Sequence, residues 1–105
     1  MQEVDLKGHT DDQKKIIHDI KVSAFLNIAA CNIKVKAFQE AVQACDEVLK
    51  LEPSNIKALY RRARATALPI NAGVPDLRKA MKDLTKVQEL SSNSLEYVKK
   101  EMKRV

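Results

Sequence analysis

Aromatic residues, glycine and proline are all scarce in this sequence. Among its 105 residues there is no tryptophan, 4% are aromatic, two are glycine and three are proline. So few glycines and prolines leave little material for tight turns, whereas residues that favour helices, such as alanine, leucine and lysine, are plentiful. The composition therefore predicts an all-α protein, and the length predicts a single domain.

Long apolar runs and a leader sequence are also missing. We find no stretch approaching the ~18 uncharged apolar residues that a membrane-spanning helix needs. The polar start MQEVDLKGHT is unlike a signal peptide. We therefore expect a cytoplasmic protein with no membrane partner, in which residues 1–9 form a flexible lead-in.

Residues that commonly carry catalysis or bind metals are few and scattered. Cys31 and Cys45 each lie in an apolar helical pattern and form no C-x-x-C pair, so we expect two reduced, buried thiols. His18 has no candidate nucleophile at a matching spacing, and His9 lies in the lead-in. These four residues show no metal-ligand spacing, and a glycine-rich phosphate loop is missing. We therefore predict that the chain is not an enzyme and holds no metal or cofactor.

The sequence contains an internal repeat. The segment VSAFLNIAACNIK, residues 22–34, recurs as IKALYRRARATAL, residues 56–68, at an offset of 34 residues. Small residues fall on small ones, as Ala24 on Ala58, and large apolar residues on large ones. A period of 34 residues is that of the tetratricopeptide repeat (TPR), a helix–turn–helix unit.

The second halves of the two units match at a longer offset. Phe38 pairs with Leu77 and Leu51 with Leu90, 39 residues apart. The five extra residues must lie in LPINAGVPD, because its prolines and glycine interrupt any helix. We therefore predict an inserted loop at residues 69–75.

These matches predict an antiparallel α-solenoid of helix–turn–helix units with a capping helix at its C-terminal end. The TPR domain covers residues 10–105, with repeats at 22–55 and 56–94 and a final helix at 92–104. Breaks in the apolar pattern and capping residues give the expected helices: one from a cap at Thr10 or Asp11 to about Val35, one at Ala37–Leu51, one from a cap at Ser54 to Leu68, and one from Pro75 to about Leu90.

The segment SNIKALYRRARA, residues 54–65, is basic throughout, and the whole chain has a net charge of +5. Lys57 and Arg61 are four residues apart, and Arg64 continues the same helical stripe. Asn27 occupies the position equivalent to Arg61 in the preceding repeat. From composition alone a solvated helix face is the better interpretation, and we expect Arg62 to point toward a neighbouring helix. Nucleic-acid binding is disfavoured, because aromatic residues are scarce and acidic residues interrupt the basic ones elsewhere.

The stretch KVSAFLNIAACNIKVKAFQEAVQACDEVLKLEPSNIKALYRRARA resembles the second and third repeats of the TPR domain in the large immunophilins. These are FK506-binding proteins and cyclophilins that carry a peptidyl-prolyl isomerase domain ahead of a TPR domain. The segments LNIAAC, LEPSN and KALYRRA carry the resemblance, which covers roughly residues 16–105. It implies that any isomerase activity belongs to a domain outside this chain.

The resemblance also implies a co-chaperone function. In that family the concave face of the repeats binds the acidic C-terminal tail of heat-shock protein 90 or 70, which ends Glu-Glu-Val-Asp, through a carboxylate clamp. The matching residues here are Asn27, Lys57 and Arg61, with Arg64 as a candidate addition. The clamp positions of the first repeat have no counterpart, so three of five are present. The alternative is a general TPR scaffold that binds another protein without such a clamp.

The first helix carries more apolar surface than its repeat requires. Ile16, Ile17 and Ile20 extend the apolar stripe beyond the start of the repeat at Val22. An uncovered end of a solenoid is adhesive, because each unit buries its apolar face against a neighbour. We therefore predict a homodimer formed through this helix. Three aromatic residues are expected to belong to the core instead of a contact surface: Phe25, Phe38 and Tyr60.

Overall fold

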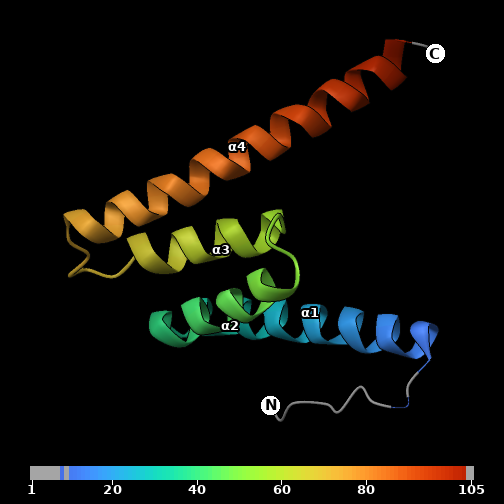
Figure 1. Ribbon diagram of the computed structural model, residues 1–105. Helices are drawn as coiled ribbons and strands as arrows, with labels where there is room; N and C mark the ends of the chain where they lie inside the picture. The colour runs from blue at the N-terminus through green and yellow to red at the C-terminus, as the bar shows by residue number, and fades with distance from the viewer. Residues whose placement is uncertain (1–7, 9, 104–105) are drawn as a thin grey trace.

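Four helices make up the regular structure of the chain. The computed structural model describes the backbone of residues 8 and 10–103 and the side chains of residues 8 and 10–92, so most of the predicted lead-in lies outside the described residues. The described residues contain helices and turns but no strand, which confirms the predicted all-α helical-repeat class. Figure 1 shows the helices in chain order: α1 (Asp11–Lys34), α2 (Phe38–Leu51), α3 (Ile56–Ala67) and α4 (Val74–Lys103).

Side-chain caps fix where two of the helices begin. At the start of α1, Gln13 N donates to Thr10 Oγ1 (3.2 Å) and Thr10 N donates to Gln13 Oε1 (3.0 Å), which forms a capping box. At the start of α3, Ala58 N donates to Asn55 Oδ1 (2.9 Å). The prediction of Thr10 as a cap is confirmed. That of Ser54 is wrong, because Asn55 is the residue placed three positions before the free N–H of Ala58.

Lys36 closes α1 in a left-handed backbone conformation, with φ of 64°. Its N–H donates to the Ile33 carbonyl (3.1 Å), and Ala37 N donates to the Asn32 carbonyl (2.7 Å). The two bonds form a Schellman motif, in which the position of Lys36 is usually occupied by glycine. A side chain at this position costs about 1 kcal/mol, because its Cβ crowds the backbone.

Small side chains allow the first three helices to pack closely. α2 packs against both α1 and α3, and α1 also touches α3 directly. The largest fully buried side chains are Leu59, Val48 and Cys45, and Phe25 packs against the clusters that contain the last two. The other contacts are made chiefly by alanines: Ala29, Ala41, Ala44, Ala58, Ala63 and Ala65. This core places α1 and α3 side by side.

Two side chains predicted to be buried are exposed. Cys31 lies on a face of α1 that the other described helices leave open, so only Cys45 is a buried thiol. Tyr60 is 48% exposed. It follows the buried Leu59 in α3, and one residue along a helix turns the side chain by about 100°. The prediction of Phe25 and Phe38 as core residues is better founded, since both pack against buried clusters.

Apolar residues occupy two faces of α1. Val22, Ala29 and Ile33 are buried in the core, whereas Ile16 and Ile20 are 57% and 62% exposed. By length and composition alone, α1 is long and apolar enough to cross a membrane, which the sequence analysis did not expect. This is weak support for a membrane span, because core helices of soluble proteins meet the same criterion and α1 packs against α2 and α3.

The segment between α3 and α4 is a loop of residues 68–73. Ala72 N donates to the Pro69 carbonyl at 3.0 Å, and Gly73 N donates to Asp76 Oδ2 at 3.1 Å. The second bond places a carboxylate in the first turn of α4, where the helix dipole favours negative charge. Pro75 lies in the same turn, as the sequence analysis predicted.

α4 is one uninterrupted helix from Val74 to Lys103. A break at SSN, residues 91–93, and a separate final helix at 92–104 were predicted, and this prediction is wrong. Serine and asparagine cost a helix only ~0.5 kcal/mol each, and the stretch contains no glycine or proline to stop it. In the described part of the chain, α4 packs against α3 and contacts neither α1 nor α2.

Candidate peptide-binding site

Arg61 joins the two helices that carry the predicted site residues. From the middle of α3, its Nη1 donates a hydrogen bond to the Leu26 carbonyl of α1 at 2.8 Å. Leu26 immediately precedes Asn27 in the chain. The structure therefore brings the half-buried guanidinium of Arg61 to the segment of α1 that carries Asn27.

Lys57 lies one turn before Arg61 on α3, and both Lys57 and Asn27 are exposed. Their four-residue spacing makes Lys57 and Arg61 project from the same side of the helix. Within the described residues, no ion pair involves either of these cations. Their positive charge is therefore available to an anion from outside the chain.

Arg64 continues this basic surface toward the end of α3. Its guanidinium carbon lies 6.0 Å from the centroid of the Tyr60 ring, a distance at which the ring face attracts a cation. Arg64 is exposed and, among the described ion pairs, has no carboxylate partner. The exposed Tyr60 therefore holds Arg64 in place while leaving its charge free.

A groove of about 500 Å³ lies beside these residues, between the C-terminal parts of α1 and α3. We call it the α1–α3 groove. Its cationic residues are Arg61 and Arg64 from α3, and Lys34 and Lys36 from the end of α1. The remaining lining residues are apolar: Ala30, Ile33, Phe38 and Leu68.

Sequence reasoning missed Lys34 and Lys36 as site residues. The only signal was the pair of lysines in KVK, which lies at a predicted helix end where cations commonly satisfy the helix dipole. Their relation to Arg61 depends on the packing of α1 against α3, and a repeat pattern alone does not show it.

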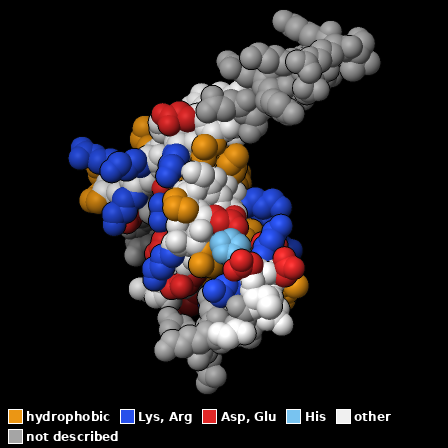
Figure 2. Space-filling model, turned by 45° about the vertical axis from the view of Figure 1, so that its right-hand side comes forward, with side chains coloured by type: hydrophobic (Ala, Val, Ile, Leu, Met, Phe, Trp, Pro, Cys, Tyr) orange, Lys and Arg blue, Asp and Glu red, His pale blue; other side chains and the backbone are white. Residues whose placement is uncertain are grey.

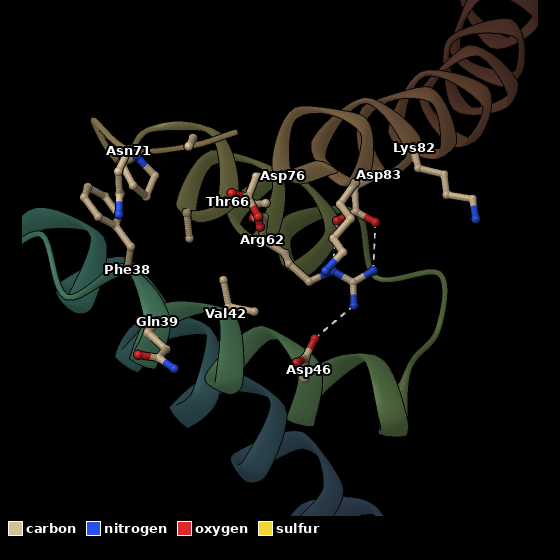
Figure 3. Close-up of a pocket in the computed structure, with 14 residues that line it drawn as sticks. Phe38, Gln39, Val42, Asp46, Arg62, Thr66, Asn71, Asp76, Lys82 and Asp83 are labelled. Carbon is tan, nitrogen blue, oxygen red and sulfur yellow. Dashed lines mark hydrogen bonds and ion pairs between the residues drawn. The ribbon is translucent and has the colours of Figure 1, made fainter. Parts of the chain in front are cut away.

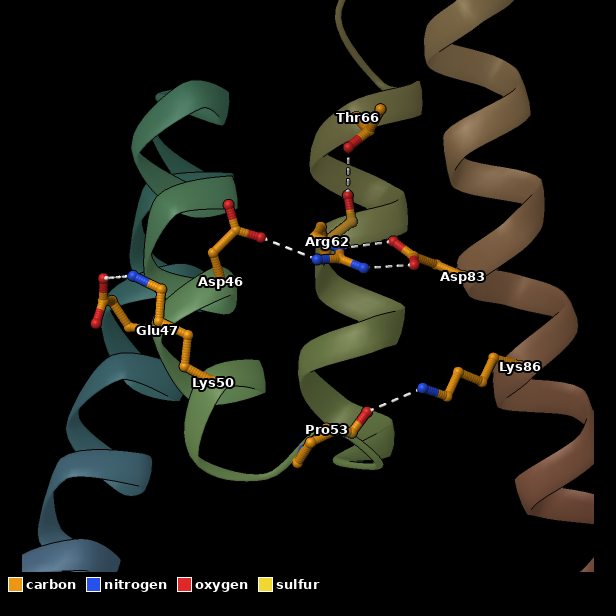
Figure 4. A network of polar contacts seen from close by, with 8 residues as sticks. All are labelled: Asp46, Glu47, Lys50, Pro53, Arg62, Thr66, Asp83 and Lys86. Carbon is orange, nitrogen blue, oxygen red and sulfur yellow. Dashed lines mark hydrogen bonds and ion pairs between the residues drawn. The ribbon is translucent and has the colours of Figure 1, made fainter.

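Arg62 differs from its basic neighbours because acidic partners surround it. Figure 4 shows its guanidinium between Asp46 of α2 and Asp83 of α4. Nε and Nη2 donate to the two oxygens of Asp83 at 2.8 and 2.7 Å, and Nη1 donates to Asp46 Oδ1 at 2.9 Å. These bonds, above all those to Asp83, raise the pKa of Arg62 above its ordinary value. The prediction that Arg62 faces neighbouring helices is confirmed.

A larger cavity of about 780 Å³ lies among α2, α3 and the start of α4. Figure 3 shows Phe38 and Val42 on one side of it, with Arg62, Asp46 and Asp83 at its end. The Arg62 charge is already matched by the two carboxylates. This cavity is therefore less suited to an anionic ligand than the α1–α3 groove.

His18 connects α1 to the turn between α2 and α3. Its Nε2 lies 2.7 Å from Glu52 Oε2, and Asn55 Nδ2 donates to Glu52 Oε1 at 2.9 Å. Figure 2 shows this histidine, in pale blue, beside acidic side chains. The bonds from Asn55 and then His18 lower the pKa of Glu52. The arrangement is structural: within the described residues, no cluster of three or more histidine, cysteine or acidic side chains could hold a metal ion.

The residues predicted to mediate self-association differ in exposure. Ile16 and Ile20 are well exposed, whereas Ile17 is half-buried. Ile28 and Val35 extend the exposed apolar surface along α1. An apolar stripe is therefore present, although only two of the three predicted residues contribute substantially to it.

Comparison with known proteins gives several relatives. Over 82 residues, or 78% of this chain, the sequence is 40% identical to FK506-binding protein 59 of Drosophila melanogaster. Over 79 residues, or 75% of the chain, it is 32% identical to peptidyl-prolyl cis-trans isomerase FKBP4 of mouse and of rat. The aligned segment spans 16 to 17% of these proteins. No protein-family model matches the chain.

Proposed function

Because this chain is homologous to a segment of the large immunophilins outside their isomerase domain, and its four helices are consistent with their TPR domain, we propose that it is a peptide-binding module of a co-chaperone. The proposed ligand is the acidic C-terminal tail of heat-shock protein 90 or 70. The chain itself is not the isomerase. One observation carries the proposal: Lys57 and Arg61 face the Asn27 segment with no carboxylate partner among the described residues.

The chemistry of these residues suits a terminal carboxylate. One Arg61 N–H is used by the Leu26 carbonyl, which fixes the plane of the guanidinium and leaves its other donors for a ligand. Lys57 adds a mobile ammonium from the same side of α3, and the Asn27 amide adds an uncharged donor. Two cations and an amide can hold the main-chain and side-chain carboxylates of a C-terminal aspartate.

A synthetic peptide ending Glu-Glu-Val-Asp tests the proposal directly. The free-acid peptide should bind, and its C-terminal amide should bind much more weakly because one carboxylate is lost. Lys57→Ala and Arg61→Ala should each weaken binding of the free acid by ~1.5–3 kcal/mol. Calorimetric titration of the whole chain measures both effects.

Arg78→Ala is the matched control, because Arg78 is an exposed cation on α4 and lines neither of the two cavities described above. It removes the same charge as Arg61→Ala and should leave affinity nearly unchanged. Equal affinities for the free acid and the amide would refute the clamp and favour the general scaffold.

Self-association is a second candidate function, favoured by the exposure of Ile16 and Ile20. A two-fold dimer through α1 would let each chain cover the apolar stripe of the other. Sedimentation over a range of concentrations should then show a dimer, and Ile16→Glu with Ile20→Glu should abolish it. A monomer at every concentration in both proteins would refute this candidate.

A further inference from the structure

We propose that the α1–α3 groove binds the residues that precede the C-terminal acid of the peptide, accepting one apolar side chain on its floor and one carboxylate at its rim. This inference rests on the proposed clamp and extends it. The groove and the clamp share Arg61, so a peptide held by its terminus at Arg61 has the groove directly beside it.

The balance of charge in the groove favours an anion. The C-terminal ends of α1 and α3 both border it, and each helix end carries about half a negative charge. The two ends together offset about one of the four positive charges from Lys34, Lys36, Arg61 and Arg64. No acidic side chain is among the residues that line the groove. A substantial positive excess therefore remains after the helix dipoles are satisfied.

The floor of the groove requires an apolar partner as well as a charged one. Leu68 is 50% exposed, and Phe38 is half-buried against the cluster of Ile33 and Ala41. A free acidic side chain or a phosphate ion would satisfy the rim but leave this apolar surface in water. An extended peptide segment with an apolar residue next to an acidic one satisfies both.

The backbone of Lys36 points to the same conclusion. Its position is one where glycine would relieve the crowding of Cβ in the left-handed conformation. Lysine at this position places a fourth cation at the rim, at the expense of stability. Strain of this kind is common at ligand-binding sites. Binding and stability should therefore change in opposite directions when Lys36 is replaced by glycine.

Three synthetic peptides test the inference on the whole chain. The first is the tetrapeptide Glu-Glu-Val-Asp, the second adds Asp-Leu at its N-terminus, and the third adds Ser-Gly. The Asp-Leu extension should tighten binding about tenfold, since it adds a charge-assisted contact. The Ser-Gly extension should have little effect.

Two substitutions identify the groove as the source of the gain. Lys36→Gly should remove most of the advantage of the Asp-Leu peptide, leave the tetrapeptide affinity unchanged, and raise the unfolding temperature. Leu68→Ser should also reduce the advantage, through the floor. Arg78→Ala is again the charge-matched control and should preserve the full advantage.

The outcomes separate this inference from the proposed clamp. If the tetrapeptide binds but the two extended peptides bind equally, the clamp stands and the groove inference is wrong. If Lys36→Gly weakens all three peptides alike, Lys36 belongs to the clamp and the rim assignment is wrong. If none of the three peptides binds, the clamp and the groove both fail.

Discussion

The guanidinium of Arg62 holds the carboxylate of Asp83 by two parallel hydrogen bonds, of 2.8 Å from Nε and 2.7 Å from Nη2. Asp83 is only 9% exposed, so Arg62 is the partner that makes its burial tolerable. The third hydrogen bond of Arg62, to Asp46, reaches the opposite helix. One side chain of α3 thereby connects α2 with α4.

Loss of Arg62 should therefore strongly destabilise the fold. Arg62→Ala leaves the Asp83 carboxylate buried without a partner and should lower the free energy of unfolding by about 3 kcal/mol. Asp46→Asn should cost at most about 1 kcal/mol, because Asp46 is largely exposed. Urea denaturation of the two variants measures the difference, and equal losses would contradict the dominant role of Asp83.

The two cysteines should react at very different rates. Cys31 is exposed, whereas Cys45 is buried, and burial raises the pKa of its thiol from 9.0 to about 11. At pH 8 an alkylating reagent should modify Cys31 quickly and Cys45 only after unfolding. Mass spectrometry should show one adduct in buffer and two in denaturant. Rapid double labelling of the folded chain would show that the packing around Cys45 is wrong.

Acid should weaken the contact between α1 and the α2–α3 turn. The pKa of Glu52 lies below its ordinary value of 4.5, because Asn55 and His18 bond to the carboxylate. A lowered pKa stabilises the fold above the unfolded value, and this contribution is lost as the pH falls through the folded value. Glu52→Gln should therefore reduce stability at pH 6 and have a smaller effect near pH 3. A difference that grows toward low pH would contradict this sign.

The continuity of α4 can be tested at residue 92. Ser92→Pro should interrupt the helix, because proline removes a hydrogen bond and clashes with the preceding turn at a cost of ~3 kcal/mol. The helical circular dichroism signal should fall, whereas Ser92→Ala should leave it unchanged or slightly higher. An unchanged signal in the proline variant would show that the helix already ends near this residue.

Periodicity and helix-breaking residues predicted most helix boundaries to within one or two positions, because α1, α2 and α3 are limited by capping residues or by proline and turn residues. The boundary at residues 91–93 failed for the opposite reason. Polar residues without glycine or proline mark the surface of a helix as readily as its end. The exposure of Cys31 was also unpredictable, since an apolar pattern does not show which face of a helix another element covers.

The candidate site divides in the same way. Lys57 and Arg61 lie on one helix, and their spacing alone predicts a shared face. The relation of Arg61 to the Asn27 segment was suggested by the repeat and is supported by the bond to Leu26. Lys34 and Lys36 could not be assigned, because their contribution requires α1 to end beside the end of α3. Such a meeting is a property of packing.

The position of α3 has a consequence for the order in which the helices open. α4 packs against α3 and, in the described part of the chain, against neither α1 nor α2. It can therefore detach while the first three helices stay folded, as expected for a stack in which each unit interacts with its neighbours. Amide protons of α4 should exchange with solvent early. Those of α3 should exchange last, because either neighbouring helix can leave while the other still protects it.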